Sequence, residues 1–240
     1  MPLFFIVPGK QKGDLISLSE KESHHLRNVQ RVKARDLLKL TDGEGSYFEG
    51  EVISVSSKVV SLKILKKETP EEPKTKLHIG QSLLKKDKME WVVEKCVELG
   101  VYEIHPFTSS RTIAQFKGEN KKDRLEKIVD AATKQCERTT RMKIHPHKNF
   151  EELFSKNADL KIIFWEKATL SLRQFFQGKS QPSSVVALIG PEGGFSDEEI
   201  DLACQHGYET VSLGQRILRA ETAAIVATTV IQYELGNLSK

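Results

Sequence analysis

The stretch VVALIGPEGGFSDEEI, residues 185–200, decides the fold of this chain. It opens with five apolar residues rich in valine and isoleucine, which predicts a buried β-strand. Ser196, with Glu199 three residues later, forms a capping box and predicts the start of a helix. A loop with three glycines and a proline therefore joins a buried strand to a helix. In open α/β sheets ligands bind beyond the carboxyl ends of the strands, and glycine lets backbone groups approach a ligand closely.

A second stretch of the same kind follows at residues 213–224, LGQRILRAETAA. A strand expected over 209–213 ends at a glycine, and Arg216 and Arg219 precede an alanine-rich helix start. Because the two loops follow consecutive strands, we expect them to face each other and to form one ligand site. A tight turn without a ligand is the alternative for the first loop, and solvated surface arginines are the alternative for the second. The first loop is more elaborate than a turn requires, and Arg219 stands beside Glu221 between apolar residues, so a ligand site is favoured.

The common nucleotide-binding motifs do not match the first loop. The dinucleotide pattern GxGxxG is absent there, which argues against a nicotinamide-dependent dehydrogenase. The stretch Gln177-Gly178-Lys179-Ser180 resembles the end of a P-loop, but the first glycine of that motif would fall at Arg173. An NTPase is therefore rejected as well.

Strands and helices alternate in the larger, C-terminal part of the chain. Strands are expected over 77–80, 101–107, 160–165, 185–189 and 209–213. Helices are expected over 89–97, 125–136, 170–176, 197–206 and 220–235. This alternation predicts an α/β domain with a mostly parallel sheet.

The N-terminal part has a different sequence pattern. Residues 1 to about 70 read as short strands separated by polar turns, with strands over 37–40, 47–53 and 59–64. This spacing predicts a small β-barrel or sandwich. Two prolines among charged residues, Pro70 and Pro73, then indicate a linker. We therefore expect one domain over 1–72 and a second over 73–240.

The charge distribution points to a polyanionic partner. The chain has 37 basic and 33 acidic residues, a formal net charge of +4. Basic residues gather within 27–35, 85–88, 121–124 and 134–143. A solvated surface would account for any one of these clusters, but several together favour contacts with phosphates.

No segment suggests a membrane, a secretory route or a metal. The longest clean apolar run, 185–189, is only long enough for a strand, and the N-terminus lacks a secretory signal. Cys96, Cys136 and Cys204 form no CxxC pair, which fits a reducing compartment and argues against a zinc ribbon. His145 and His147 lack the second half of a metal-binding set. We expect a cytoplasmic protein without a metal site.

Taken together, the two loops resemble a known family. Gly190-Pro191-Glu192-Gly193-Gly194 with Leu213-Gly214-x-Arg216-Ile217-Leu218-Arg219-x-Glu221-Thr222-Ala223 is similar to the bacterial 16S ribosomal RNA uridine-N3 methyltransferases of the SPOUT superfamily. Weaker matches extend the resemblance over nearly the whole chain: His25 with Arg31 and Asp42-Gly43, Lys88-Met89-Glu90 with Lys95 and 98–101, Ser110-Arg111, and Gln135-x-x-Arg138.

The resemblance implies both a fold and an activity. It implies an RNA-binding PUA-like β-barrel over 1–72 and an α/β SPOUT methyltransferase domain with a trefoil knot over 73–240. It implies a homodimer that uses S-adenosyl-L-methionine as its cofactor. The expected reaction is methylation of N3 of a specific uridine in 16S ribosomal RNA, within the small ribosomal subunit.

Position and resemblance together give the candidate site residues. The cofactor-binding candidates are Trp165, Ile189, Gly190, Pro191, Glu192, Gly193, Gly194, Leu213, Gly214, Ile217, Leu218 and Ala223. The RNA-binding candidates are Arg31, Lys88, Arg111, Gln135 and Arg138, the arginines because guanidinium binds phosphate with two hydrogen bonds. Uridine N3 must lose a proton before it can attack a methyl group, so the site needs a base or a cation that stabilises the anion. Arg219 is the candidate cation and Glu192 or Glu221 the candidate base, although Glu221 could instead orient Arg219.

Two other classes of protein stay open at this point. An RNA-binding ribosome assembly factor without methyl-transfer activity would explain the basic clusters, but it has no need for the two facing loops. Binding of adenosylhomocysteine would distinguish it from a methyltransferase. A metabolic enzyme that uses an adenine nucleotide would explain the loops but not the basic N-terminal domain, and failure to bind RNA would favour it.

Overall fold

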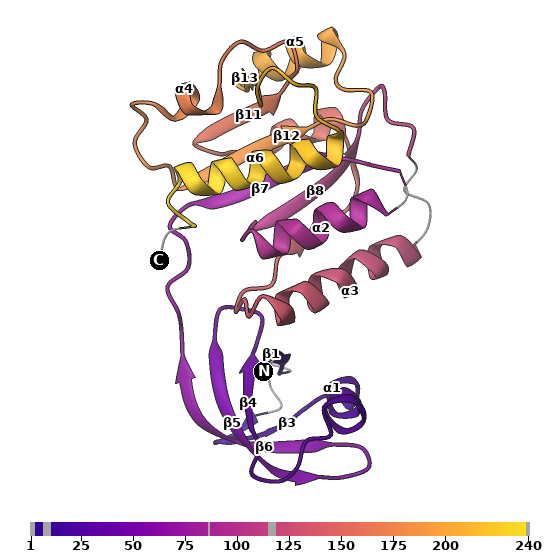
Figure 1. Ribbon diagram of the computed structural model, residues 1–240, viewed down its shortest axis with the longest axis vertical. Coiled ribbons are helices and arrows are strands. Elements are labelled where there is room, and N and C mark those ends of the chain that lie inside the picture. Colours follow the sequence, from indigo (N-terminus) through magenta and orange to yellow (C-terminus); the bar gives the residue numbers. More distant parts are fainter. Residues whose placement is uncertain (1–2, 7–10, 86, 115–118, 239–240) are drawn as a thin grey trace. The chain divides into compact units, whose positions relative to one another are not determined.

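A computed structural model describes residues 3–6, 11–85, 87–114 and 119–238 (Figure 1). The chain forms two compact units. Unit 1 consists of residues 1–72 and 130–141, and unit 2 of residues 73–129 and 142–240. The assignment of RNA binding to 1–72 and methyl transfer to 73–240 stays a prediction.

Unit 1 is built on a six-stranded sheet. Its strands are β1 (Leu3–Phe5), β2 (Gln11–Lys12), β3 (Leu15–Ser17), β4 (Leu37–Thr41), β5 (Tyr47–Val55) and β6 (Val60–Glu68), in the order β1-β4-β5-β6-β3-β2. The pair β1–β4 is parallel and the others are antiparallel. Alternate residues point inward and form a core that includes Phe4, Ile16, Leu40, Phe48 and Leu62. The strands expected near 37–40, 47–53 and 59–64 are confirmed.

Unit 1 also holds helical structure, so the expectation that residues 1 to about 70 consist of strands alone is wrong. After β3 the chain forms helix α1 (Glu20–His25) and the π-helical turn η1 (Leu26–Gln30). The Ser19 hydroxyl caps the helix by accepting a hydrogen bond from the Glu22 backbone N–H at 3.2 Å. Leu26 is fully buried in the core. A six-residue α-helix that continues into a π-helical segment of five residues is too short and too irregular to give a clear 3.6-residue period in the sequence.

Residues 130–141 return from the later part of the chain to unit 1. The Thr41 hydroxyl donates a hydrogen bond to the Thr139 carbonyl at 2.8 Å. Lys39 forms an ion pair with Glu137 at 2.7 Å, and the Arg141 backbone N–H donates to the Gly43 carbonyl at 2.9 Å. These contacts join residues nearly a hundred positions apart, which no local pattern in the sequence signals.

Unit 2 is an α/β domain around a parallel sheet. Its strands are β7 (Lys76–Ser82), β8 (Glu103–Thr108), β9 (Lys143–Ile144), β10 (Lys148–Asn149), β11 (Leu160–Phe164), β12 (Ser184–Ile189) and β13 (Glu209–Val211). The order is β10-β8-β7-β12-β11-β13, with β9 also paired to β8. All pairings are parallel. The strands expected in this part of the chain are confirmed, and the parallel sheet with them.

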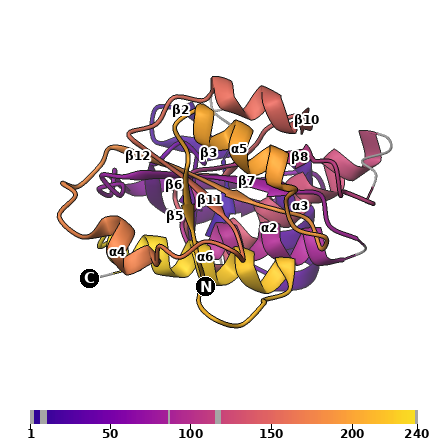
Figure 2. The ribbon, with the colours of Figure 1, turned by 90° about the horizontal axis from the view of Figure 1, so that it is seen from above.

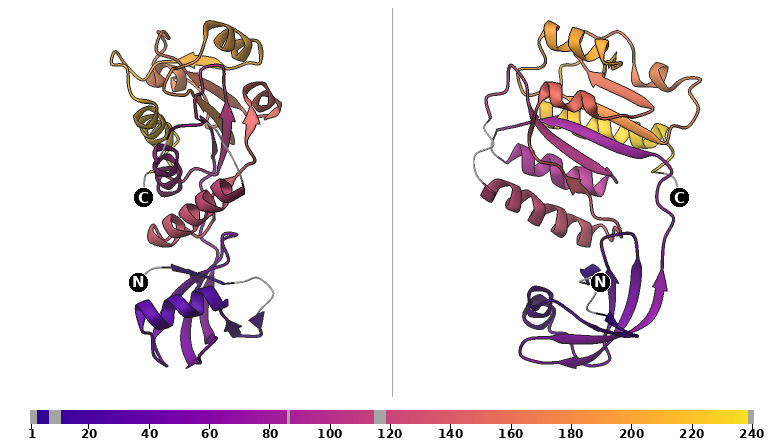
Figure 3. Two further views of the ribbon diagram at one scale, coloured as in Figure 1. Left: turned by 90° about the vertical axis from the view of Figure 1, so that its right-hand side faces the viewer. Right: turned by 180° about the vertical axis from the view of Figure 1, so that it is seen from behind.

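Helices cover both faces of this sheet. They are α2 (Lys88–Glu98), the 3-10 helix η2 (Phe150–Ser155), α4 (Leu172–Phe176), α5 (Asp197–Gln205) and α6 (Ala220–Glu234). Helix α3 (Glu119–Gln135) begins in unit 2, and its residues from Asp130 onward belong to unit 1. Helices α2 and α6 pack together on one face, and α5 lies on the other (Figures 2 and 3). Beneath α5 and η2, a core of aromatic and aliphatic side chains includes Phe107, Phe150, Phe195 and Ile200. Within the described residues, no helix is both long and apolar enough to span a membrane.

Candidate active site

The two motif loops of the sequence meet in one pocket of about 290 Å³. One loop follows β12, the other follows β13, and the residues after β11 lie between them. Because β12, β11 and β13 are adjacent and parallel, their carboxyl ends meet at the same edge of the sheet. Every cofactor-binding candidate of the sequence analysis lines this pocket. The structure adds Phe164, Glu166, Phe195, Ser212, Gln215, Arg216 and Ala220.

The loop after β12 needs its glycines for steric reasons. A Cβ on Gly190 would lie 3.2 Å from the buried Phe195 ring. Gly194 has a φ of +68°, in the left-handed region, and its N–H closes a turn by donating to the Pro191 carbonyl at 3.0 Å. The capping box of Ser196 and Glu199 then starts α5 as expected. Backbone atoms rather than side chains therefore form this wall of the pocket.

Arg111 holds the same loop from outside. Its Nη1 donates hydrogen bonds to the carbonyls of Gly193 and Phe195, each at 3.1 Å. A Cβ on Gly193 would lie 3.2 Å from the Arg111 Cβ, so the two residues are in close contact. The sequence placed Arg111 among the RNA contacts and gave no sign of this second role. Hydrogen bonds to two carbonyls of one loop fix the shape of its backbone.

The second loop turns on Gly214, which has a φ of +112°. The Ser212 hydroxyl accepts a hydrogen bond from the Gly214 N–H at 3.1 Å, which tightens the turn. Ile217 lines the pocket and is 86% exposed. Arg219 is the N-cap residue of α6, its side chain makes no capping hydrogen bond, and it is exposed. It stands one residue before the pocket-lining Ala220.

The two candidate bases differ in their surroundings. The Glu192 carboxylate accepts a hydrogen bond from the Lys85 backbone N–H at 3.1 Å and lines the pocket. Glu221 forms an ion pair with Lys88 at 3.0 Å. Partial burial raises the pKa of Glu221, but backbone hydrogen bonding at the helix start and the Lys88 ammonium outweigh it, so the pKa lies below its usual value. A carboxylate with a lowered pKa is a weak base.

One buried polar atom in the pocket wall is left without a partner. The Trp165 Nε1 is buried and makes no hydrogen bond with any residue that the structure describes. The indole N–H can only donate, and leaving it unpaired in a buried position costs free energy. The pocket volume lies close to the lower end of the range typical of small-molecule sites. An orphaned donor beside a glycine-built wall fits a polar organic ligand.

The RNA-binding candidates are distributed over both units. Arg31 is exposed at the end of η1 with a left-handed φ of +54°. Gln135 is exposed at the end of α3, and Arg138 follows it in the returning segment of unit 1. Lys88 and Arg111 belong to unit 2 and make the contacts described above.

Comparisons with protein families agree with this fold. A family model of an RNA methyltransferase domain matches residues 70–232. A second model, of an RNA methyltransferase PUA domain, matches residues 18–65. The α/β unit with its loop pocket, together with a PUA-like N-terminal domain, thus defines an RNA methyltransferase.

Individual relatives identify the family within this class of enzymes. A ribosomal RNA small subunit methyltransferase E from Buchnera aphidicola subsp. Schizaphis graminum is 34% identical, with 100% of this chain and 98% of the relative covered. A crystal structure of such a protein from Neisseria gonorrhoeae, bound to S-adenosyl methionine, is 30% identical with a TM-score of 0.88, and 97% of each chain is covered. A methyltransferase from Legionella pneumophila in complex with the same cofactor is 32% identical with a TM-score of 0.87 and the same coverage. The chain belongs to the ribosomal RNA small subunit methyltransferase E family.

Proposed function

We propose that this chain transfers the methyl group of S-adenosyl-L-methionine to N3 of a specific uridine in 16S ribosomal RNA of the small ribosomal subunit, in the cytoplasm. The observation that carries the proposal is the pocket in which both motif loops meet. Relatives of 30% and 32% identity have been crystallised with this cofactor.

The pocket residues fit the cofactor. Backbone groups of 190–194 and 213–218 would hold it, with Ala223 and the indole of Trp165 completing the walls. The Trp165 N–H, which has no partner among the described residues, would find an acceptor on the ligand. When bound, the cofactor would supply a methyl group on a sulfonium, and in-line attack on that methyl carbon would release S-adenosylhomocysteine.

The protein's own contribution is alignment and charge. A positioned nucleophile reacts faster because its translational and rotational entropy has already been lost on binding. The uridine N3 anion spreads its charge over the flanking carbonyl oxygens, so a nearby cation stabilises it. We assign this role to Arg219, which starts α6 beside the pocket. Glu221, with its lowered pKa, is better suited to orienting Lys88 than to taking the proton, so Glu192 is the more suitable base.

A homodimer and a knot belong to the same proposal. The sheet-facing side of α6 buries Ala224, Ala227 and Ile231, yet its other side is also apolar and carries Tyr233, which is 70% exposed. A helix that is apolar on all sides is normally covered, and a second copy of the chain would cover it. The family resemblance supports the trefoil knot. The path of the chain also supports it, because β13 lies at the edge of the sheet and α6, which follows it in sequence, packs on the inner strands β7 and β12.

The reaction is tested with purified protein, labelled methyl donor and small ribosomal subunits that lack the modification. We expect label in 16S RNA that elutes as 3-methyluridine after digestion to nucleosides. Label in another nucleoside would contradict the N3 assignment. Binding of the subunits without transfer of label would favour the assembly factor.

The role of Arg31 is tested separately by RNA binding. If its guanidinium neutralises a phosphate, Arg31→Ala should weaken binding to RNAs of different sequence by a similar factor. It should also reduce the slope of log affinity against log salt by about 1. Fluorescence anisotropy with labelled RNA at several salt concentrations measures both. Arg173→Ala, an exposed change on α4 outside the basic clusters, is the matched control. An unchanged slope for Arg31→Ala would remove Arg31 from the RNA contacts.

A further inference from the structure

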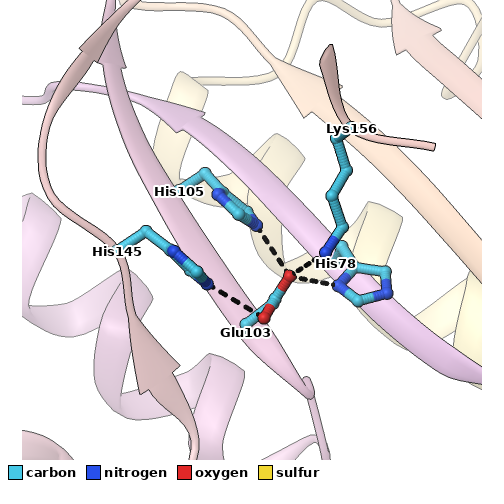
Figure 4. Close-up of polar contacts among 5 residues, drawn as sticks. All are labelled: His78, Glu103, His105, His145 and Lys156. Carbon is cyan, nitrogen blue, oxygen red and sulfur yellow. Dashed lines mark hydrogen bonds and ion pairs between the residues drawn. The ribbon is translucent and has the colours of Figure 1, made fainter. Parts of the chain in front are cut away.

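A cluster of polar side chains lies in unit 2 away from the loop pocket, around the buried carboxylate of Glu103 (Figure 4). His78 Nδ1 lies 2.8 Å and His105 Nε2 3.0 Å from one carboxylate oxygen. His145 Nε2 lies 2.9 Å from the other oxygen. The Lys156 ammonium also contacts Glu103. Neither the proposed methyl transfer nor the loop pocket uses any of these groups.

The register of the sheet brings the cluster together. His78 on β7 is paired with Glu103 on β8, and Gly80 is paired with His105 two residues further on. His145 follows β9 directly, and its ring stacks on His105 with centroids 4.1 Å apart. Because alternate residues of a strand share one face, Glu103 and His105 project on the same side.

A cavity of about 180 Å³ adjoins the cluster. One water needs roughly 10–15 Å³ on the same measure, so the cavity has room for a polyatomic ligand. Gly80 lines the cavity and is packed against Leu188, because a Cβ there would lie 2.4 Å from a Leu188 methyl carbon. The remaining lining residues are His105, His145, Lys148, Leu153, Ser155, Lys156, Val186 and Leu188. Of the described residues, no aspartate or glutamate lines the cavity, while two lysines and two histidines do.

The charges of the cluster disfavour a cation. His78, Glu103 and His105 offer ligand atoms within 4.8 Å of one another, a set that could hold a metal ion. However, Lys156 already lies on the Glu103 carboxylate, and Lys148 lines the cavity without an ion pair to any described residue. Burial lowers the pKa of His105, which disfavours a positive charge on its ring. One carboxylate and two ammonium groups leave a net positive charge, which repels a metal ion and attracts an anion.

We propose that this cavity binds a phosphate-like oxyanion through Lys148 and Lys156. An ammonium group has three hydrogen-bond donors, so Lys156 can contact Glu103 and still donate to an anion. Its side chain is 34% exposed, whereas that of Glu103 is 6% exposed. The buried carboxylate therefore acts as a fixed anchor that holds Lys156 and the two stacked histidines at the cavity wall. The apolar side formed by Leu153, Val186 and Leu188 would accommodate a phosphate ester as well as free phosphate.

Calorimetric titration of the full chain with inorganic phosphate, at constant ionic strength, tests the proposal. We expect saturable binding of one phosphate per chain. Lys148→Ala should weaken it by about ten- to hundredfold, the effect typical of losing a charge-assisted hydrogen bond, and Lys148→Arg should retain most of it. Lys143→Ala is the matched control, because this exposed lysine of β9 carries the same charge but does not line the cavity. Thermal melts of each variant verify that it is folded.

A second titration identifies the source of the phosphate. If Lys148→Ala loses affinity for phosphate but keeps that for a short single-stranded RNA, the cavity takes a free phosphate or a small ester. If affinity for both falls, the cavity takes a phosphate of the RNA backbone. Absence of phosphate binding by the wild type, or equal losses in Lys143→Ala and Lys148→Ala, would overturn the proposal. Uptake of one zinc ion per chain without phosphate binding would show that the cluster is a cation site instead.

Discussion

Replacing Arg219 with alanine is expected to slow methyl transfer by about 10²–10³-fold while donor binding changes little. Arg219 begins α6 beside the pocket, where a nucleobase must approach the methyl group. A positioned cation acts on the charge that develops at N3 and its carbonyls, which exists only as the reaction proceeds. Single-turnover rates with saturating donor measure the chemical step, and calorimetry with adenosylhomocysteine measures binding.

Two further variants separate this role from the alternatives. Arg219→Lys should recover little activity, because a point charge does not reproduce the planar pair of donors. If Arg219 had only a structural role, both variants would be less stable than the wild type. The Arg219 side chain makes no capping hydrogen bond and is exposed. We therefore expect both variants to change the melting temperature by no more than an ordinary surface substitution does. A near-normal single-turnover rate in a stable Arg219→Ala protein would remove Arg219 from the catalytic residues.

The elements with strong local signals could be predicted from the sequence. The apolar run 185–189, the capping box at Ser196 and the glycine turn after 209–213 each specify their structure within a few residues. Since parallel strands bring their carboxyl ends to one edge, the sequence predicted that the two loops share a site. It did not show that β11 lies between β12 and β13 in the sheet. The helical segment over 20–30 was missed because its α-helical part is only six residues long and it lies between strands.

What could not be predicted depends on contacts between distant residues. Arg111 was singled out for its charge, but its hydrogen bonds to Gly193 and Phe195 arise only when β8 and β12 share a sheet. His145 was not considered a metal ligand, because the sequence has no second pair of ligand residues to complete a metal site with His145 and His147. Its partners come from earlier strands, His78 on β7 and Glu103 on β8, and only the register of the sheet brings them together.

Gly193→Val is expected to weaken binding of adenosylhomocysteine by roughly 5- to 150-fold, about 1–3 kcal/mol of binding free energy, because an overpacked loop must leave the conformation that forms the pocket wall. A Cβ at this position would lie 3.2 Å from the Arg111 Cβ and 3.6 Å from the Arg111 carbonyl oxygen. Valine adds two methyl groups beyond that Cβ, so either the loop or Arg111 must move. Any such movement disturbs the hydrogen bonds from Arg111 to the loop carbonyls and hence the pocket wall.

The control for this prediction is another glycine of the same unit. Gly178 has a left-handed φ of +73° and open space around its Cβ position, and it does not line the pocket. Gly178→Val therefore introduces backbone strain without a clash near the donor loop, so it should lower the melting temperature and leave adenosylhomocysteine binding intact. Gly193→Val should show the reverse, a loss of affinity larger than its loss of stability. If folded Gly193→Val protein bound adenosylhomocysteine with wild-type affinity, the loop after β12 would not hold the donor, and the assignment of the pocket would be wrong.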